Sequence, residues 1–138
     1  MATYNKYTAA VEPLLEGINA GSDAWKIALA STVDAADTTF VAGTTDLATG
    51  GGYTQGGETA TVSSATQTSG TYKLILNSPS VWTATGAGFS FRYVILYDST
   101  TSTPVGYWDY GSTVTMNGAN GDTFTVTLDA TNGVFQVS

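Results

Sequence analysis

The stretch that most constrains the fold is residues 88–111, GFSFRYVILYDSTTSTPVGYWDYG. Aromatic and β-branched residues alternate along its first half, with Phe89, Phe91, Tyr93, Ile95 and Tyr97 on one face and Ser90, Arg92, Val94 and Leu96 on the other. A period of two indicates a strand. Because both faces carry apolar residues, we expect a central strand that is covered on both sides. A polar loop and a second aromatic run follow, so the stretch predicts a hairpin at the centre of a β core.

The rest of the chain supports a β fold. The sequence contains 25 threonines and 16 glycines, and threonine favours strands. From residue 58 onward, short alternating runs are separated by turn residues at roughly 8–12-residue spacing, which favours a β-sandwich or barrel. We therefore predict one mainly β domain over residues 1–138, an antiparallel β-sandwich or jelly-roll-like barrel. Asn132-Gly133 predicts a tight hairpin between residues 122–128 and 134–137.

The N-terminal third has a different character. Apolar residues recur at spacings of three and four over residues 4–20, which predicts a short N-terminal helix, kinked or divided at Pro13. Residues 24–30 alternate as a first strand, with Trp25, Ile27 and Leu29 directed inward. Residues 31–57 are polar and glycine-rich, and we expect a long loop there. Connections of that length are normally functional or mobile.

The composition excludes several classes of function. The chain has no cysteine and no histidine, so it has no disulfides, no zinc site of the usual kinds and no histidine acid or base. Four cationic residues oppose 11 acidic ones for a net charge of -7, which argues against nucleic-acid binding. The sequence starts without a signal-peptide pattern and contains no apolar run of membrane-spanning length. We expect a soluble, non-enzymatic protein without cofactors or membrane contacts.

Individual residues give few signs of chemistry. Glu58, Asp98, Asp109 and Asp129 lie at strand ends, but their turn-like surroundings favour backbone capping over a glycosidase pair. Asp34 and Asp37 lack the spacing of a calcium loop, and Gly50-Gly51-Gly52 lacks the residues of a phosphate loop. Trp82, Tyr107 and Trp108 could stack on a sugar, although packing in the core is the preferred interpretation. Arg92, the single arginine, is predicted to be buried and paired with Asp109.

Several segments resemble a family of small structural proteins from the virions of tailed bacteriophages. They are TSGTYKLIL (68–76), FRYVILYD (91–98), GYWDYGSTVTM (106–116) and DTFTVTLDATNGVFQVS (122–138), and residues 4–29 resemble the start of the same family. The resemblance implies a capsid decoration (cement) protein that binds the major capsid protein. A tail, baseplate or fibre component is the alternative within that class. A carbohydrate-binding β-sandwich module is the alternative from another class.

The resemblance also implies a location and an assembly. Such a protein would be made in the bacterial host cytoplasm and would sit on the capsid exterior as a homo-oligomer, a trimer or a dimer. The N-terminal segment and the 31–57 loop are expected to contact the shell. The candidate contact residues are apolar or aromatic side chains in these two segments: Tyr4, Tyr7, Leu14, Phe40, Leu47 and Tyr53.

Overall fold

The computed structural model describes residues 2–138, and its regular structure is mainly antiparallel strands. The elements in chain order are β1 (Thr3–Lys6), a 3₁₀ helix η1 (Thr8–Ala10), α1 (Val11–Glu16), β2 (Trp25–Ala30), β3 (Glu58–Thr59), β4 (Val62–Thr68), β5 (Thr71–Leu76), β6 (Trp82–Thr83), β7 (Phe89–Asp98), β8 (Thr103–Met116), β9 (Thr123–Phe124) and β10 (Phe135–Val137). The predicted fold class, mainly β with one short N-terminal helix, is confirmed.

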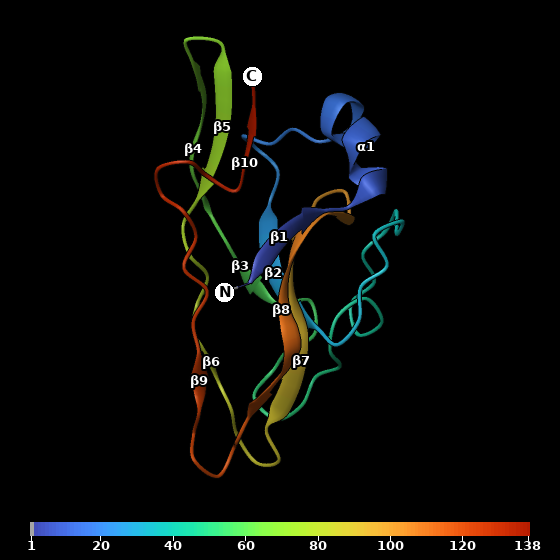
Figure 1. Cartoon of the computed structure of the whole chain (residues 1–138), viewed down its shortest axis with the longest axis vertical. Coiled ribbons are helices and arrows are strands. Elements are labelled where there is room, and N and C mark those ends of the chain that lie inside the picture. Colours follow the sequence, from blue (N-terminus) through green and yellow to red (C-terminus); the bar gives the residue numbers. More distant parts are fainter. Residues whose placement is uncertain (1) are drawn as a thin grey trace.

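The strands form two layers that face each other, as in a β-sandwich (Figure 1). One layer is a five-stranded sheet in the order β1-β8-β7-β2-β3. The other contains a three-stranded sheet, β10-β5-β4, and the two-stranded sheet β6-β9. Every pairing is antiparallel. The hairpin β7–β8 lies in the middle of the larger sheet, as the sequence predicts.

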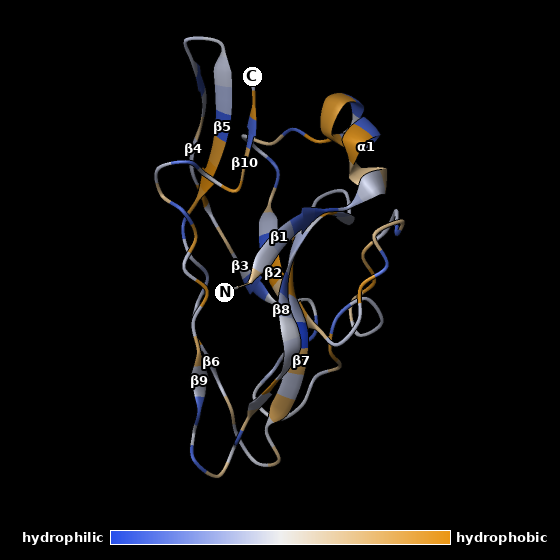
Figure 2. Cartoon of the chain, in the orientation of Figure 1, coloured by the Kyte–Doolittle hydropathy of each residue, from blue (hydrophilic) through white to orange (hydrophobic). Residues whose placement is uncertain are grey.

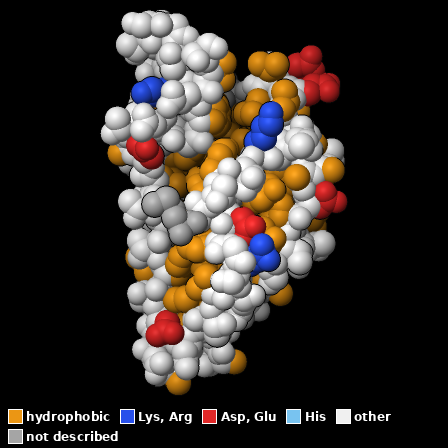
Figure 3. Space-filling model, in the orientation of Figure 1, with side chains coloured by type: hydrophobic (Ala, Val, Ile, Leu, Met, Phe, Trp, Pro, Cys, Tyr) orange, Lys and Arg blue, Asp and Glu red, His pale blue; other side chains and the backbone are white. Residues whose placement is uncertain are grey.

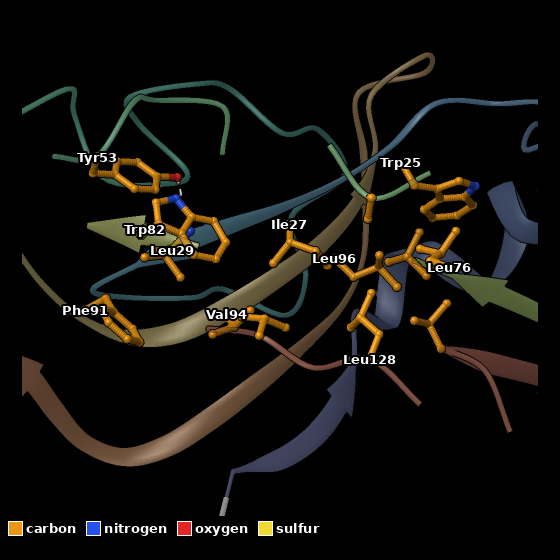
Figure 4. Packing of buried hydrophobic residues seen from close by; sticks show 14 of the residues in the cluster. Trp25, Ile27, Leu29, Tyr53, Leu76, Trp82, Phe91, Val94, Leu96 and Leu128 are labelled. Atoms are coloured by element: carbon orange, nitrogen blue, oxygen red, sulfur yellow. Dashed lines mark hydrogen bonds between the residues drawn. The ribbon is translucent and has the colours of Figure 1, made fainter. Parts of the chain in front are cut away.

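The five-stranded sheet is buried on both faces. Its inner face packs against the opposite layer, and Figure 4 shows Trp25, Ile27 and Leu96 within this main cluster. Its outer face carries a second cluster, in which Ala28 and Ile95 are covered by η1 and by the loop residue Phe40. Two covered faces explain why apolar residues occupy both sides of β2 and β7.

The strict alternation predicted for residues 89–97 is wrong at Arg92. Phe91 pairs with Val114 and Tyr93 pairs with Asp109, so residues 110–113 of β8 lie opposite Arg92 alone. After this irregularity the alternation along β7 is inverted, because a shift of one position places each following side chain on the opposite face of the sheet. Consequently Phe91 packs in the main cluster, whereas Tyr97 packs in the outer one.

The N-terminal prediction is correct only in part. Residues 3–6 form β1, an edge strand paired with β8, where the sequence predicts helix. The helical segment begins at Thr8, and α1 ends at Glu16; the N–H of the following Gly17 donates to Pro13 O at 2.8 Å. Pro13 lies in the first turn of α1, where the missing N–H costs nothing, so it does not break the helix.

The long loop is present, but the C-terminal hairpin is not. Residues 31–57 form no helix or strand beyond one bridge between Gly50 and Tyr53. The predicted pairing of residues 122–128 with 134–137 is wrong, because β9 pairs with β6 and β10 pairs with β5. Val126 and Leu128 are nevertheless buried, as the alternation predicts. Within residues 2–138, no helix is long and apolar enough to cross a membrane.

Candidate binding surfaces and the acidic residues

The acidic residues at strand ends stabilise turns and do not converge on one site. Asp129 Oδ1 accepts hydrogen bonds from Thr131 N–H and Asn132 N–H, each at 2.8 Å. Asp109, predicted at a strand end, lies within β8 and is paired with Arg92, as described below. No group of three or more potential metal-ligating side chains occurs in the described part of the chain.

Asp98, the last residue of β7, differs from these other acidic residues because it is fully buried. Its Oδ1 accepts hydrogen bonds from Thr100 N–H at 2.8 Å and Thr101 N–H at 3.1 Å. Asp98 pairs with Trp25 in the sheet, which places Asp23 diagonally opposite on the same face. Its Oδ2 is buried without a fixed donor and faces the Asp23 carboxyl. Burial raises the pKa of Asp98, and the neighbouring Asp23 carboxyl raises it further.

Replacing Asp98 with asparagine is therefore expected to change how stability depends on pH. The pKa of Asp98 is raised in the folded state. Its contribution to the stability of the fold is therefore fully present below its unfolded pKa, near 3.8, and is lost as pH rises through its folded pKa. Asparagine resembles the protonated acid at every pH, and its amide can donate to Asp23. The melting temperature of Asp98→Asn relative to the original chain should therefore increase between about pH 4 and about pH 7, as measured by differential scanning fluorimetry.

Asp129→Asn provides a matched control for this experiment. Asp129 makes the same pair of backbone hydrogen bonds, but hydrogen bonds from Asn132 and Thr131 lower the pKa of its carboxyl. Its contribution is present above the unfolded pKa and is lost as pH falls, so Asp129→Asn should be destabilising at neutral pH and neutral in acid. Parallel pH trends for the two variants would contradict the assignment of Asp98.

The predicted ion pair between Arg92 and Asp109 is present in the structure, but it is not buried. Arg92 Nε and Nη2 donate to the two Asp109 oxygens at 2.8 and 3.0 Å, with side chains 39% and 27% exposed. Asp109 Oδ1 also accepts from Gly111 N–H at 2.7 Å. The Arg92 hydrogen bond lowers the pKa of Asp109. This partly exposed ion pair therefore links β7 to β8 at the strand irregularity.

Three of the predicted partner contacts belong to the protein's own core. Tyr7, Phe40 and Tyr53 are 0%, 6% and 1% exposed. Phe40 stacks on Tyr97 with ring centroids 3.6 Å apart, and so attaches the loop to the outer face of the sheet. The expectation that these three side chains contact a shell is therefore corrected: they fasten the N-terminal segment and the loop to the sandwich. Tyr4 is exposed, and Leu14 and Leu47 are partly exposed.

A buried carboxylate organises the loop from within. Asp46 Oδ2 accepts from Tyr53 O–H at 2.5 Å and Gly56 N–H at 2.6 Å, and its Oδ1 accepts from Gly43 N–H at 2.6 Å. Tyr53 Oη in turn accepts from Leu29 N–H at 3.1 Å, which ties the loop to β2 (Figure 4). Burial, with the hydrogen bond to Asp46, raises the pKa of Tyr53. The loop is held by a satisfied polar network, not by contacts left open for a partner.

Two grooves lie along the seam between the layers, where Figure 3 shows hydrophobic side chains at the surface. The first, which we call the helix groove, encloses about 420 Å³ between α1 and β10. Its apolar lining consists of Leu14, Leu15, Ile18, Tyr72, Phe135 and Val137. Figure 2 shows the same hydrophobic character on α1 and on the end of β10.

The second, which we call the aromatic groove, encloses about 430 Å³ between the β1–β8 edge and the chain after β9. One wall is aromatic and the other polar, comprising Tyr4, Trp108 and Tyr110 on one side and Thr125, Thr127 and Asp129 on the other. The floor is apolar. The two grooves are thus distinct in chemistry: the helix groove is apolar, and the aromatic groove is amphipathic.

Comparison with known proteins gives no match: no family model fits the chain, and no curated protein or solved structure is similar to it. The surfaces themselves are therefore the basis for assigning a function.

The sequence identifies these surfaces only in part. Leu14, Leu15 and Ile18 belong to the predicted helical stripe, but nothing local shows that this stripe is left half-covered. Trp82, for which core packing is the preferred interpretation from the sequence, is 2% exposed and packs in the core. Tyr107 packs edge-on against Tyr7 on the outer face. Tyr4 and Tyr110, which complete the aromatic groove, come together only through the pairing of β1 with β8.

Proposed function

We propose that this chain is a bacteriophage virion structural protein that decorates the capsid exterior and stabilises it by binding the lattice of the major capsid protein. The observation that carries the proposal is the exposed helix groove. Leu15 and Val137, which both line this groove, are 79% and 56% exposed. Contiguous exposed apolar surface is typical of protein–protein interfaces. The sequence resemblance to phage virion proteins supplies the class of partner.

The rest of the molecule suits this role. A two-layer β domain gives a rigid body, and its N-terminal segment and loop are fixed to that body by Tyr7, Phe40 and Asp46. Rigidity favours a static docking protein, because little conformational entropy is lost on binding. A net charge of -7 keeps many copies soluble before assembly and away from packaged DNA. In this proposal the protein is made in the bacterial cytoplasm and clusters on the shell as a trimer or a dimer.

The test is cosedimentation of the purified protein with expanded, genome-free heads of the phage that encodes it. We expect saturable binding, and we expect Leu15→Asp to weaken it about tenfold or more, because a leucine contact is lost and a charge is buried. Leu15 is largely exposed, so its replacement should leave the fold intact.

Val81→Asp is the matched control, since Val81 is an exposed valine (49%) outside the helix groove. It should bind heads like the unmodified protein. Purified protein that never sediments with heads would reject the proposal. Immunogold label confined to tails would replace it with the tail, baseplate or fibre alternative. Equal binding by Leu15→Asp and Val81→Asp would remove the helix groove as the interface.

A further inference from the structure

The aromatic groove has the composition of a site for a small amphipathic ligand. Tyr4 and Tyr110 are 39% and 38% exposed, and Trp108 between them is partly exposed. Ligand sites commonly combine apolar and aromatic walls with a few polar groups in a volume of roughly 300–1,000 Å³. A groove of about 430 Å³ lies within that range.

The rings of the aromatic wall are held in place by the sandwich. Tyr4 and Trp108 are directly opposite on β1 and β8, with ring centroids 5.1 Å apart at 57°. Tyr110 packs edge-on against Phe91 at 6.0 Å and against Phe124 at 5.9 Å. The wall is therefore pre-organised, and a ligand that stacks on it need not pay to order these side chains.

The opposite wall offers hydrogen-bonding groups at regular spacing. Residues 125–128 continue from β9 without pairing to another strand. Their side chains alternate, so that Val126 and Leu128 are buried while Thr125 and Thr127 are exposed. The result is a row of hydroxyl groups across the groove from the aromatic rings, and it ends at the Asp129 carboxylate.

The charge of the groove limits what it can hold. No lysine or arginine is among the described residues that line it, and its one charged side chain is the acidic Asp129. A phosphate, a nucleotide or an acidic chain would lack a cationic partner there and would be repelled by the carboxylate. A purely apolar chain would cover the exposed Thr125 and Thr127 side chains without offering a hydrogen-bond partner to their hydroxyl groups.

We propose that the aromatic groove is a binding site for a neutral oligosaccharide. A pyranose ring has an apolar C–H face that stacks on an aromatic side chain, and hydroxyl groups at its edge that suit threonine and carboxylate partners. The site is separate from the helix groove and extends beyond the capsid-binding role. It equips an otherwise structural protein to attach to surface glycans.

The three tryptophans make the proposal directly testable. Trp25 and Trp82 are 1% and 2% exposed, whereas Trp108 lines the groove. Protein labelled with 5-fluorotryptophan gives one ¹⁹F signal for each, and Trp108→Phe identifies the signal of Trp108. Maltohexaose, cellohexaose, chitohexaose and hexagalacturonate are then titrated to millimolar concentration. We expect at least one of the three neutral sugars to shift the Trp108 signal alone, and the acidic one to have no effect.

Two variants and a control locate the binding site. Tyr4→Ala and Tyr110→Ala should each weaken the interaction about tenfold, which corresponds to about 1.4 kcal/mol, because each removes a ring on which the sugar stacks. Tyr72→Ala, which alters the helix groove, should bind the sugar unchanged. The inference is overturned if none of the neutral hexasaccharides shifts Trp108, if the shift persists in both variants, or if hexagalacturonate binds equally well. None of these outcomes affects the capsid experiment, which depends on Leu15.

Discussion

Replacing Gly51 with alanine is expected to destabilise the protein by about 3 kcal/mol or more, a large part of the total stability of an ordinary domain. Gly51 has a φ of +63°, and a Cβ there would lie 1.8 Å from Gly88 O. Both backbones are fixed, because Thr85 N–H donates to Gly51 O at 2.9 Å and Gly88 N–H, immediately before β7, donates to Thr85 O at 2.8 Å. The clash can be relieved only by separating the loop from the sandwich.

Gly121→Ala isolates this effect from backbone strain. Gly121 has nearly the same φ, +62°, but nothing lies within 4 Å of the position of its Cβ. Gly121→Ala should therefore lower the free energy of unfolding by only about 1 kcal/mol, the penalty of an alanine in the left-handed conformation. Urea unfolding of both variants measures the difference between them. Equal losses would show that the close approach to Gly88 is unimportant.

These glycines illustrate what sequence reasoning can and cannot assign. Gly50-Gly51-Gly52 has the appearance of a phosphate loop and fails that test for lack of the following lysine. The structure supplies the actual reason for Gly51 and Gly52, which is contact with the backbone at Gly88 and Thr83. That contact joins residues more than thirty positions apart, and no local pattern encodes it.

The same limit explains the other differences between expectation and structure. The strands β2 and β7 alternate clearly, so their existence and the central place of β7 are predictable. The sequence also indicates the first half of β8, but not its continuation through Gly111 to Met116 as a single strand. The strand β1 is four residues long, and its pairing partner lies about a hundred positions away. Short segments take their structure from tertiary context, which overrides local preference. The irregularity opposite Arg92 likewise depends on the length of β8, not on the pattern within β7.

Function is harder to predict because an apolar side chain in a loop does not reveal which surface it will cover. Tyr7, Phe40 and Tyr53 have the features of partner contacts in the sequence, yet each is buried against the protein's own sheet. Leu15 lies in the same helical stripe as Leu14 and is left exposed. Only the packing distinguishes side chains that are buried against the protein's own sheet from side chains that are left exposed. For this reason we propose the helix groove as the interface in place of the loop.

Replacing Asp46 with asparagine is expected to destabilise the protein by about 2–4 kcal/mol and to release the 31–57 loop. The carboxylate accepts three hydrogen bonds, and asparagine has one acceptor oxygen. Whichever way the amide is oriented, its NH₂ group faces Gly43 N–H on one side or Gly56 N–H and Tyr53 O–H on the other. At least one buried donor then loses its partner.

Asp34→Asn is the control for this prediction, because Asp34 lies exposed in the same loop and accepts a single hydrogen bond, from Ala36 N–H at 2.9 Å. It should change the free energy of unfolding by less than about 0.5 kcal/mol. Hydrogen–deuterium exchange should accelerate across residues 43–56 in Asp46→Asn and remain unchanged in Asp34→Asn. Tyr53→Phe, which keeps the ring and removes one donor, should fall between them. If Asp46→Asn proved as stable as Asp34→Asn, the loop would have to be held by its other contacts, such as Phe40 stacking on Tyr97 and the hydrogen bond from Thr85 N–H to Gly51 O, and the polar network would have no structural role.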